Sequence, residues 1–340
     1  MINVLVTASG GDIGQGIIKS LKLSSYKNQI KIITTDINAE AAGLFLGNKG
    51  YVVAPANVNR EKYLRHITAI CKQNKTDIVF IGNEYEQFAI ASSRDKLSRQ
   101  VSTYFVVQPL KTIEICRDKL KICSILTKAG IRYPATCLGA ERAKKLISKF
   151  GYPIILKPRR GYGGVSKTHI VNNASELRRY HPAGTAMIAQ EYIANKDGEE
   201  YTVGTFLNNQ SLSLGAISML RKLRFSMTWH AIIDKFPDIT ALAVRAAETV
   251  GAIGPCNVQL RRDRLNQPCV IEINSRLSST TVFRSHLGFN EAEASIDYFL
   301  KHKLPRLKQR KAVAMRIWDE LIIPMDKYAT LKNTGEITNG

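Results

Sequence analysis

Residues 152–166, YPIILKPRRGYGGVS, place a lysine at the end of an apolar run, directly before a glycine-rich segment. The apolar run is short and rich in isoleucine, which predicts a buried strand. Lys157 ends this run, where an unpaired charge is costly to bury. By itself it could be a lysine that extends to solvent, and 161–164 could be a plain hairpin loop. Together they indicate a phosphate site, because glycines let backbone N–H groups approach a phosphate.

A second group of polar residues lies on two predicted strands that a polar turn joins. The strands are 254–262, GPCNVQLRR, and 268–274, PCVIEIN. Glu272 and Asn274 alternate along the second strand, so both side chains point to one face. Gln259, on the first strand, can face them, and oxygen donors of this kind suit Mg²⁺. We expect Glu272 to be nearly buried, where a carboxylate needs a cation.

The surrounding region mixes hairpins with helices and predicts an α+β arrangement. Asp118 and Lys119 open a helix that runs to Gly130. The other predicted elements are strands at 187–193 and 200–207, an edge strand at 211–219 and an amphipathic helix at 237–250.

The N-terminal region alternates strands with helices, which predicts a parallel α/β sheet and a Rossmann-like domain. Pro109 breaks this pattern and indicates a boundary near 108–118. The predicted strands are 2–7, 31–36, 51–55 and 77–82, and the clearest helix is 60–73.

A glycine loop follows the first predicted strand. Gly10, Gly14 and Gly16 lie between that strand and a helix, and Asp36 ends the second strand. Such a loop can bind a dinucleotide, with the aspartate on ribose hydroxyls. An NAD(P)-dependent reductase is therefore one alternative function, and a tight turn that binds nothing is the other interpretation of the loop.

The chain is strongly basic, with 49 Lys and Arg against 28 Asp and Glu among 340 residues, a net charge of +21. This balance implies an anionic partner and keeps a nucleic-acid-binding protein as a further alternative. Residues 301–316 are rich in Lys and Arg, yet the sequence shows no nucleic-acid-binding motif. Six scattered cysteines favour a reducing cytoplasm. The sequence lacks a long apolar run and a signal peptide, so we expect no membrane association.

Taken in order, the segments at 118–130, 152–166, 190–201 and 257–276 resemble the ATP-grasp superfamily, above all the ATP-grasp units of the carbamoyl-phosphate synthase large chain. The resemblance covers about residues 1–300. It implies a Rossmann-like pre-ATP-grasp domain and an ATP-grasp domain with lid and central subdomains. The implied bounds are 1–112 for the first domain, 113–300 for the second (lid about 113–190, central about 191–300) and 301–340 for a basic C-terminal extension.

The resemblance also implies roles for individual residues around ATP. Lysines hold the α- and β-phosphates, a glycine loop covers the β- and γ-phosphates, a hinge reads adenine through its backbone, and a carboxylate takes the ribose hydroxyls. The phosphate lysines are Lys119 and Lys157, and the loop glycines are Gly161, Gly163 and Gly164. The adenine hinge is Glu191, Tyr192 and Ile193, and the ribose carboxylate is Glu200. Gln259, Glu272 and Asn274 would hold Mg²⁺, with Mn²⁺ as the alternative ion. Arg276 would steady the γ-phosphate or an acyl phosphate, so it and Lys157 are the implied catalytic residues.

Two departures from the family pattern concern this last group. Ser275 stands where the family usually has proline, which can loosen the turn that aims Arg276, and Gln259 supplies an amide where other branches have a carboxylate. The chain has one ATP-grasp unit and no glutaminase-like segment, so carbamoyl phosphate synthesis is not expected.

The function implied is an ATP-dependent carboxylate–amine ligase that works through an acyl phosphate in the cytoplasm, with homodimers common in the family. Small-molecule carboxylate and amine substrates are expected, and the charge suggests that one of them is anionic. The cations expected near the cleft are Arg159, Arg160, Arg221, Lys222, Arg224, Arg276 and Arg284.

Overall fold

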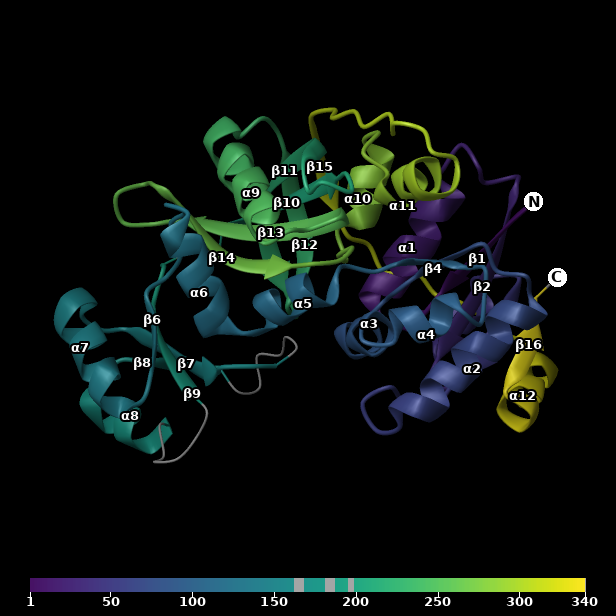
Figure 1. The fold of residues 1–340 in the computed structure, drawn as a ribbon, viewed down its shortest axis with the longest axis horizontal. Helices are drawn as coiled ribbons and strands as arrows, with labels where there is room; N and C mark the ends of the chain where they lie inside the picture. Colours follow the sequence, from purple (N-terminus) through teal and green to yellow (C-terminus); the bar gives the residue numbers. More distant parts are fainter. Residues whose placement is uncertain (162–167, 181–186, 195–198, 340) are drawn as a thin grey trace.

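The computed structural model describes residues 1–161, 168–180, 187–194 and 199–339. Their strands form two sheets of six strands and one of four. Figure 1 shows the four-stranded sheet at one end of the molecule, the N-terminal sheet at the other, and the second six-stranded sheet between them. In this described part of the chain, no helix is long and apolar enough to cross a membrane.

The N-terminal sheet has the strand order β16-β3-β2-β1-β4-β5. Strands β1 to β5 pair in parallel, and β16 pairs antiparallel with β3. Apolar side chains of β1 enter the core on both faces, as in the centre of a parallel sheet. The strands are β1 (Ile2–Val6), β2 (Ile30–Asp36), β3 (Lys49–Val52), β4 (Ile78–Phe80), β5 (Tyr104–Val106) and β16 (Glu336–Thr338), and the helices are α1 (Asp12–Lys22), η1 (Ala42–Phe45), α2 (Arg60–Gln73), α3 (Glu84–Ala91) and α4 (Arg94–Ser98).

The second sheet is antiparallel, with the order β14-β13-β10-β11-β12-β15. Helix α9 packs on β10, β11, β13 and β14. The strand at 211–219 was expected at an edge, but β11 lies between β10 and β12, so that expectation is wrong. The strands are β10 (Glu199–Leu207), β11 (Ser213–Arg224), β12 (Met227–Ile233), β13 (Gly254–Arg262), β14 (Pro268–Asn274) and β15 (Ala312–Met315), and the helices are α5 (Leu110–Arg117), α6 (Lys119–Lys128), α9 (Pro237–Thr249), α10 (Thr281–His286), α11 (Glu291–Ser295) and η4 (Ile296–Leu300).

The four-stranded sheet is antiparallel, with the order β6-β9-β7-β8, and has a small core of its own. Helices α5 and α6 precede it in the chain but share their core with the second sheet. The subdomain predicted to begin at 113 therefore starts in space at β6. Its elements are β6 (Thr136–Leu138), α7 (Ala140–Phe150), β7 (Ile154–Pro158), β8 (His169–Val171), α8 (Ala174–Tyr180) and β9 (Met187–Glu191).

The C-terminal residues predicted as an extension return to both large sheets. Strand β15 adds to β12 in the second sheet, and β16 adds to β3 in the first. Helix α12 (Met325–Thr334) supplies Leu331, which packs with Leu44 and Ile337 in a separate core. Figure 1 shows α12 and β16 beside the N-terminal sheet.

Candidate nucleotide site

Two lysines and one carboxylate from three separate elements form the centre of the candidate site. Burial lowers the pKa of Lys157, near the end of β7, to about 8. The Glu272 carboxylate opposes this shift, and the charges of Lys119 and Arg261 add to it. Burial also lowers the pKa of Lys119, the first residue of α6, again against the charge of Glu272. Asp118 also acts on Lys119 but pairs with Arg159 and Arg160, so the cluster holds more positive charge than Glu272 and Asp118 neutralise.

Glu272 reaches this cluster from an exposed position. Sequence reasoning predicted a nearly buried carboxylate, and this prediction is wrong because the side chain is exposed. Strand β14 is at the edge of its sheet, and its Val270 and Ile273 pack in the core shared with α9. The Glu272 side chain is therefore exposed to solvent, where a carboxylate can bind a cation.

The other two predicted metal ligands lie beside Glu272. Gln259 is opposite Glu272 in the β13–β14 register. With its amide oriented to satisfy its neighbours, Gln259 donates to Glu272 Oε2 at 2.9 Å and accepts from Asn274 Nδ2 at 3.2 Å and from Arg221 Nη2 at 3.3 Å. The structure thus brings the three predicted ligands together, with Gln259 as the link between them.

This donor set fits Mg²⁺ bound in company with a polyphosphate. Among the described residues, no group of three His, Cys, Asp or Glu side chains is arranged to hold a metal. One carboxylate and two amides are a sparse set of ligands. Mg²⁺ is commonly bound by one or two carboxylates together with substrate phosphates and water, so the residues present fit that mode.

Glu200 lies on β10 and is buried between two arginines. It accepts from Arg261 Nη2 at 3.1 Å and from Arg221 Nε at 3.2 Å, and it pairs with Arg221 Nη2 as well. Sequence reasoning missed Arg261, although Asn257, Gln259 and Arg261 alternate on one strand and share a face. Glu200 is predicted to bind the ribose hydroxyls, and its carboxylate already accepts hydrogen bonds from two guanidinium groups.

The predicted adenine hinge, Glu191 to Ile193, is held from both sides. Glu191 binds Arg132 through both oxygens, at 2.6 and 3.0 Å, and its backbone N–H donates to Ala135 O at 2.8 Å. The Ile193 carbonyl accepts from Arg261 Nη1 at 3.0 Å. The Glu191 side chain therefore fixes the segment, and Tyr192 lies half-buried between the two anchored residues.

The start of the second glycine loop is fastened to helix α6. Asp118 caps this helix by accepting from Leu120 N at 3.1 Å, and it pairs with Arg159 Nη2 at 2.8 Å and Arg160 Nε at 3.1 Å. Burial opposes ionisation of Asp118, but the hydrogen bonds from Arg159, the Lys121 N–H and Arg160 together outweigh it, and the pKa of Asp118 falls to about 2. Of the predicted loop glycines, Gly161 adopts a positive φ of 156° with open space around it. Gly163 and Gly164 lie outside the described residues.

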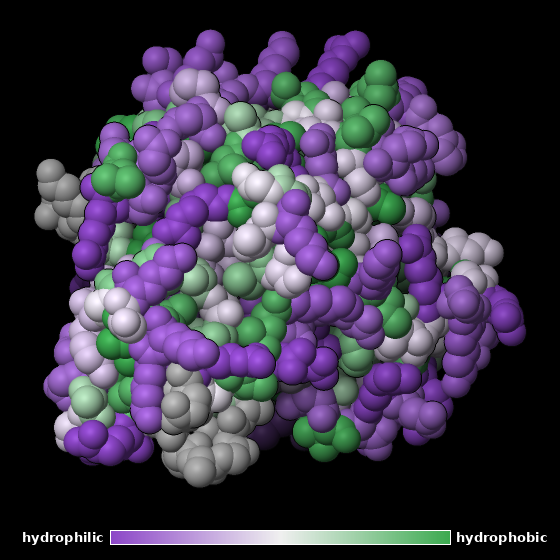
Figure 2. Space-filling model, turned by 60° about the vertical axis from the view of Figure 1, so that its left-hand side comes forward, coloured by the Kyte–Doolittle hydropathy of each residue, from purple (hydrophilic) through white to green (hydrophobic). Residues whose placement is uncertain are grey.

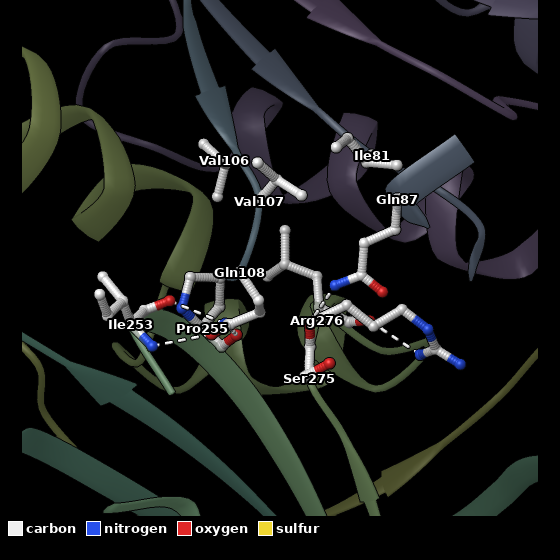
Figure 3. A pocket seen from close by; sticks show the side chains of 10 residues that line it. Ile81, Gln87, Val106, Val107, Gln108, Ile253, Pro255, Ser275 and Arg276 are labelled. Carbon is white, nitrogen blue, oxygen red and sulfur yellow. Dashed lines mark hydrogen bonds between the residues drawn. The ribbon is translucent and has the colours of Figure 1, made fainter. Parts of the chain in front are cut away.

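Arg276 lies at the turn after β14 and contacts the N-terminal domain. Its Nε donates to Glu84 Oε1 at 2.9 Å, and the Gln87 amide donates to the carbonyl of Ser275. Gln87, Ser275 and Arg276 line a cavity of about 10 Å³, with Gln108, Ile253 and Pro255 along its other side (Figure 3). A neighbouring recess of about 40 Å³ is lined by Glu84, Gly161, Glu272, Asn274 and Arg276, among others.

Several cations expected to face the cleft are already neutralised. Arg284 is fully buried and binds Glu291 at 2.8 Å, so its placement in the cleft was wrong. Four of the other predicted cations pair with acidic groups: Arg159 and Arg160 with Asp118, Arg221 with Glu200, and Arg276 with Glu84. Much of the excess charge instead lies on the surface. Figure 2 shows hydrophilic side chains over much of one face, with apolar ones scattered between them.

The N-terminal glycine loop is held by Asp36 and by close backbone packing. Asp36 accepts from Gly10 N at 2.8 Å and from Asn38 N at 3.1 Å, so both carboxylate oxygens serve the local backbone. A Cβ at Gly14 would lie 2.3 Å from the Ala8 carbonyl oxygen, which explains that glycine by close packing. These contacts support the interpretation of the loop as a tight turn.

Comparisons with known proteins agree with this geometry. A family model described as "ATP-grasp domain" matches residues 116–280. The carbamoyl phosphate synthase large chain of Sulfurisphaera tokodaii is 26% identical over 192 residues, which cover 52% of this chain and 18% of that protein. The formate-dependent phosphoribosylglycinamide formyltransferase of the same organism is 22% identical over 328 residues, 89% of this chain and 78% of that protein.

Among solved structures, N5-carboxyaminoimidazole synthetase from Staphylococcus aureus complexed with ADP superposes with a TM-score of 0.72. It is 18% identical and covers 93% of this chain and 82% of its own, so the likeness concerns the fold. The present chain spans only about a fifth of the length of the synthase large chain that it matches. The family model thus identifies residues 116–280 as an ATP-grasp domain.

Proposed function

We propose that the chain is an ATP-dependent ligase that converts a small-molecule carboxylate to its acyl phosphate and then joins the acyl group to an amine. One observation carries the proposal: the Lys119 N–H donates to Arg159 O at 3.1 Å, which places the start of α6 at the end of β7, and the charge of Glu272 on β14 acts on both Lys119 and Lys157. A triphosphate with Mg²⁺ would supply negative charge that balances the lysines and a metal ion for which Glu272 is a ligand.

The residues would divide the work as follows. Lys119 and Lys157 hold phosphate oxygens as point charges. Glu272 and Asn274, joined by Gln259, would hold Mg²⁺, which when bound neutralises charge on the phosphates. Arg276 lines the same recess as Glu272 and Asn274 and would stabilise charge on the transferred phosphoryl group.

The proposed reaction has two steps and needs no side-chain nucleophile. A carboxylate oxygen of the substrate attacks the γ-phosphorus, the bond to the β–γ bridging oxygen breaks, and ADP leaves. The amine then attacks the acyl carbon, inorganic phosphate leaves, and the amine releases a proton. The protein contributes position and charge, which dominate catalysis of phosphoryl transfer.

The proposal is tested with the full chain and a matrix of carboxylates and amines, measured by release of ADP and phosphate. We expect ATP with Mg²⁺ to raise the melting temperature, and one acid–amine pair to release phosphate in step with product. A melting temperature raised by NADPH but not by ATP with Mg²⁺ would contradict the proposal and favour a reductase. Glu61→Gln, in an exposed part of α2, serves as the matched control for Glu272→Gln.

A further inference from the structure

Two residues of helix α3 in the N-terminal domain form hydrogen bonds with the turn that carries Arg276. Glu84 and Gln87 are three positions apart and so share a face of the helix. Glu84 accepts from Nε and Nη2 of Arg276, and Gln87 donates to the Ser275 carbonyl. Gln87 and Ser275 are only 4% and 5% exposed, so this second contact is shielded from water. Figure 3 shows Gln87 pointing toward Ser275 and Arg276 across the cavity.

These hydrogen bonds fix the orientation of the Arg276 guanidinium relative to Asn274. Arg276 Nη2 donates to Asn274 Oδ1 at 3.2 Å, and Nη1 donates to Leu277 O at 3.0 Å. Glu84 is the charged partner among these acceptors, and charge-assisted hydrogen bonds are the stronger kind. Loss of Glu84 would leave the guanidinium held by the two contacts within its own turn.

Helix α3 is itself fixed by the N-terminal sheet. Glu86 is buried and accepts from Thr7 Oγ1 at 2.5 Å, directly after β1. A Cβ at Gly82 would lie 2.2 Å from the Thr7 carbonyl oxygen, so the segment that enters α3 packs against β1 without room for a side chain. The position of Glu84 and Gln87 is therefore set by the N-terminal domain.

We infer that Glu84 and Gln87 are positioning residues that aim Arg276 at the phosphoryl group through the turn at 274–276; this rests on the proposed function. Ser275 has no ring to fix its φ, unlike a proline, so the turn depends on contacts from outside. The Gln87–Ser275 hydrogen bond holds the backbone of the turn, and the Glu84–Arg276 pair holds the side chain. The N-terminal domain thereby contributes to the site without touching the reacting atoms.

The first test observes Arg276 directly and does not depend on turnover. In an arginine side-chain NMR spectrum, the Arg276 Nε–H signal is the one lost in Arg276→Lys. We expect Glu84→Ala to shift this signal and to raise its rate of exchange with water by at least tenfold. Glu61→Ala is the matched control, because Glu61 is also an acidic first-turn residue paired with an arginine, but at the surface. An unchanged Arg276 signal in Glu84→Ala would overturn the inference.

The second test separates positioning from stability. We expect Glu84→Ala to lower kcat at least tenfold, leave the Kd for ATP within twofold, and recover part of kcat in Glu84→Asp. In an Arg276→Lys background, Glu84→Ala should lower kcat less than twofold, because its effect passes through Arg276. Equal losses in both backgrounds would overturn the inference. A wild-type chain that joins no acid to any amine would contradict the proposed function, whereas the NMR result would still decide the role of Glu84.

Discussion

Strands β1 and β7 each end before a glycine-rich segment, and the polar groups at these two strand ends are arranged differently. In the N-terminal loop, both oxygens of Asp36 accept backbone N–H groups, and Gly14 is packed against the Ala8 carbonyl. At the end of β7, the charge of the exposed Glu272 acts on both Lys119 and Lys157, and positive charge is in excess because Asp118 already pairs with two arginines. Polar groups that satisfy one another stabilise a turn, whereas charges left in excess are available to a ligand, and we therefore expect the nucleotide at the second region.

The most severe test of this contrast removes the carboxylate at the centre of the second region. We expect Glu272→Gln to lower kcat by about a thousandfold, roughly 4 kcal/mol in activation free energy. The melting temperature should change little, because Glu272 is exposed. Phosphate release and a thermal melt of the same sample measure both. Turnover at the wild-type rate with Mg²⁺ would place the metal elsewhere.

Removal of a lysine should weaken nucleotide binding rather than abolish it. We expect Lys157→Ala to raise the Kd for ATP at least tenfold, about 1.4 kcal/mol, because Lys119 still contributes its charge. Isothermal titration of the folded variant measures this change. Lys149→Ala, a substitution on α7 of the same subdomain, should leave the Kd unchanged. Equal affinities for the Lys157 variant and the wild type would remove Lys157 from the site.

The affinity for ATP should also depend on pH in a definite direction. Burial lowers the pKa of Lys157 to about 8, so the free protein loses this charge as the pH rises through that value. Because phosphates bind the protonated amine, the Kd for ATP should rise above pH 8, by up to about tenfold per pH unit. Lys157→Met should flatten this dependence. A wild-type Kd that is constant between pH 7 and about 9.5 would contradict a lysine with this pKa.

The smallest effect on nucleotide binding is expected in the N-terminal loop. Asp36→Ala removes the acceptor of two backbone N–H groups and should destabilise the fold by about 1–3 kcal/mol. The Kd for ATP should stay within twofold of the wild type, and NADPH should not bind either protein. Urea unfolding and ATP titration distinguish the two regions. A large loss of ATP affinity with full stability would show that the contrast between the loops is false.

Local patterns in the sequence predicted the elements well. Helix α2 has the predicted bounds, because its apolar residues recur at helical spacing and Asn59 caps it by accepting from Lys62 N at 2.9 Å. Alternation on β14 correctly placed Glu272 and Asn274 together with Gln259. The exposure of Glu272 was missed, since a strand pattern does not reveal that β14 is an edge strand.

Contacts between distant residues could not be predicted in the same way. Glu84 meets Arg276 across 192 positions of sequence, and neither residue lies in a pattern that names the other. Arg284 illustrates the opposite error, because a cation near a predicted cleft is in fact sealed in a core with Glu291. Which charges pair with one another depends on the packing of whole domains, and single-sequence patterns do not contain that information.

The return of the C-terminal residues to the first sheet has a consequence for the order of folding during synthesis. Strand β3 leaves the ribosome early, but its antiparallel neighbour β16 and the supporting helix α12 come after all strands of the other two sheets in the sequence. Until then the edge of β3 exposes unpaired backbone groups, which invite pairing with other chains. The first sheet to begin is thus one of the last to be completed, and aggregation of nascent chains should be most sensitive to truncations that remove residues 325–339.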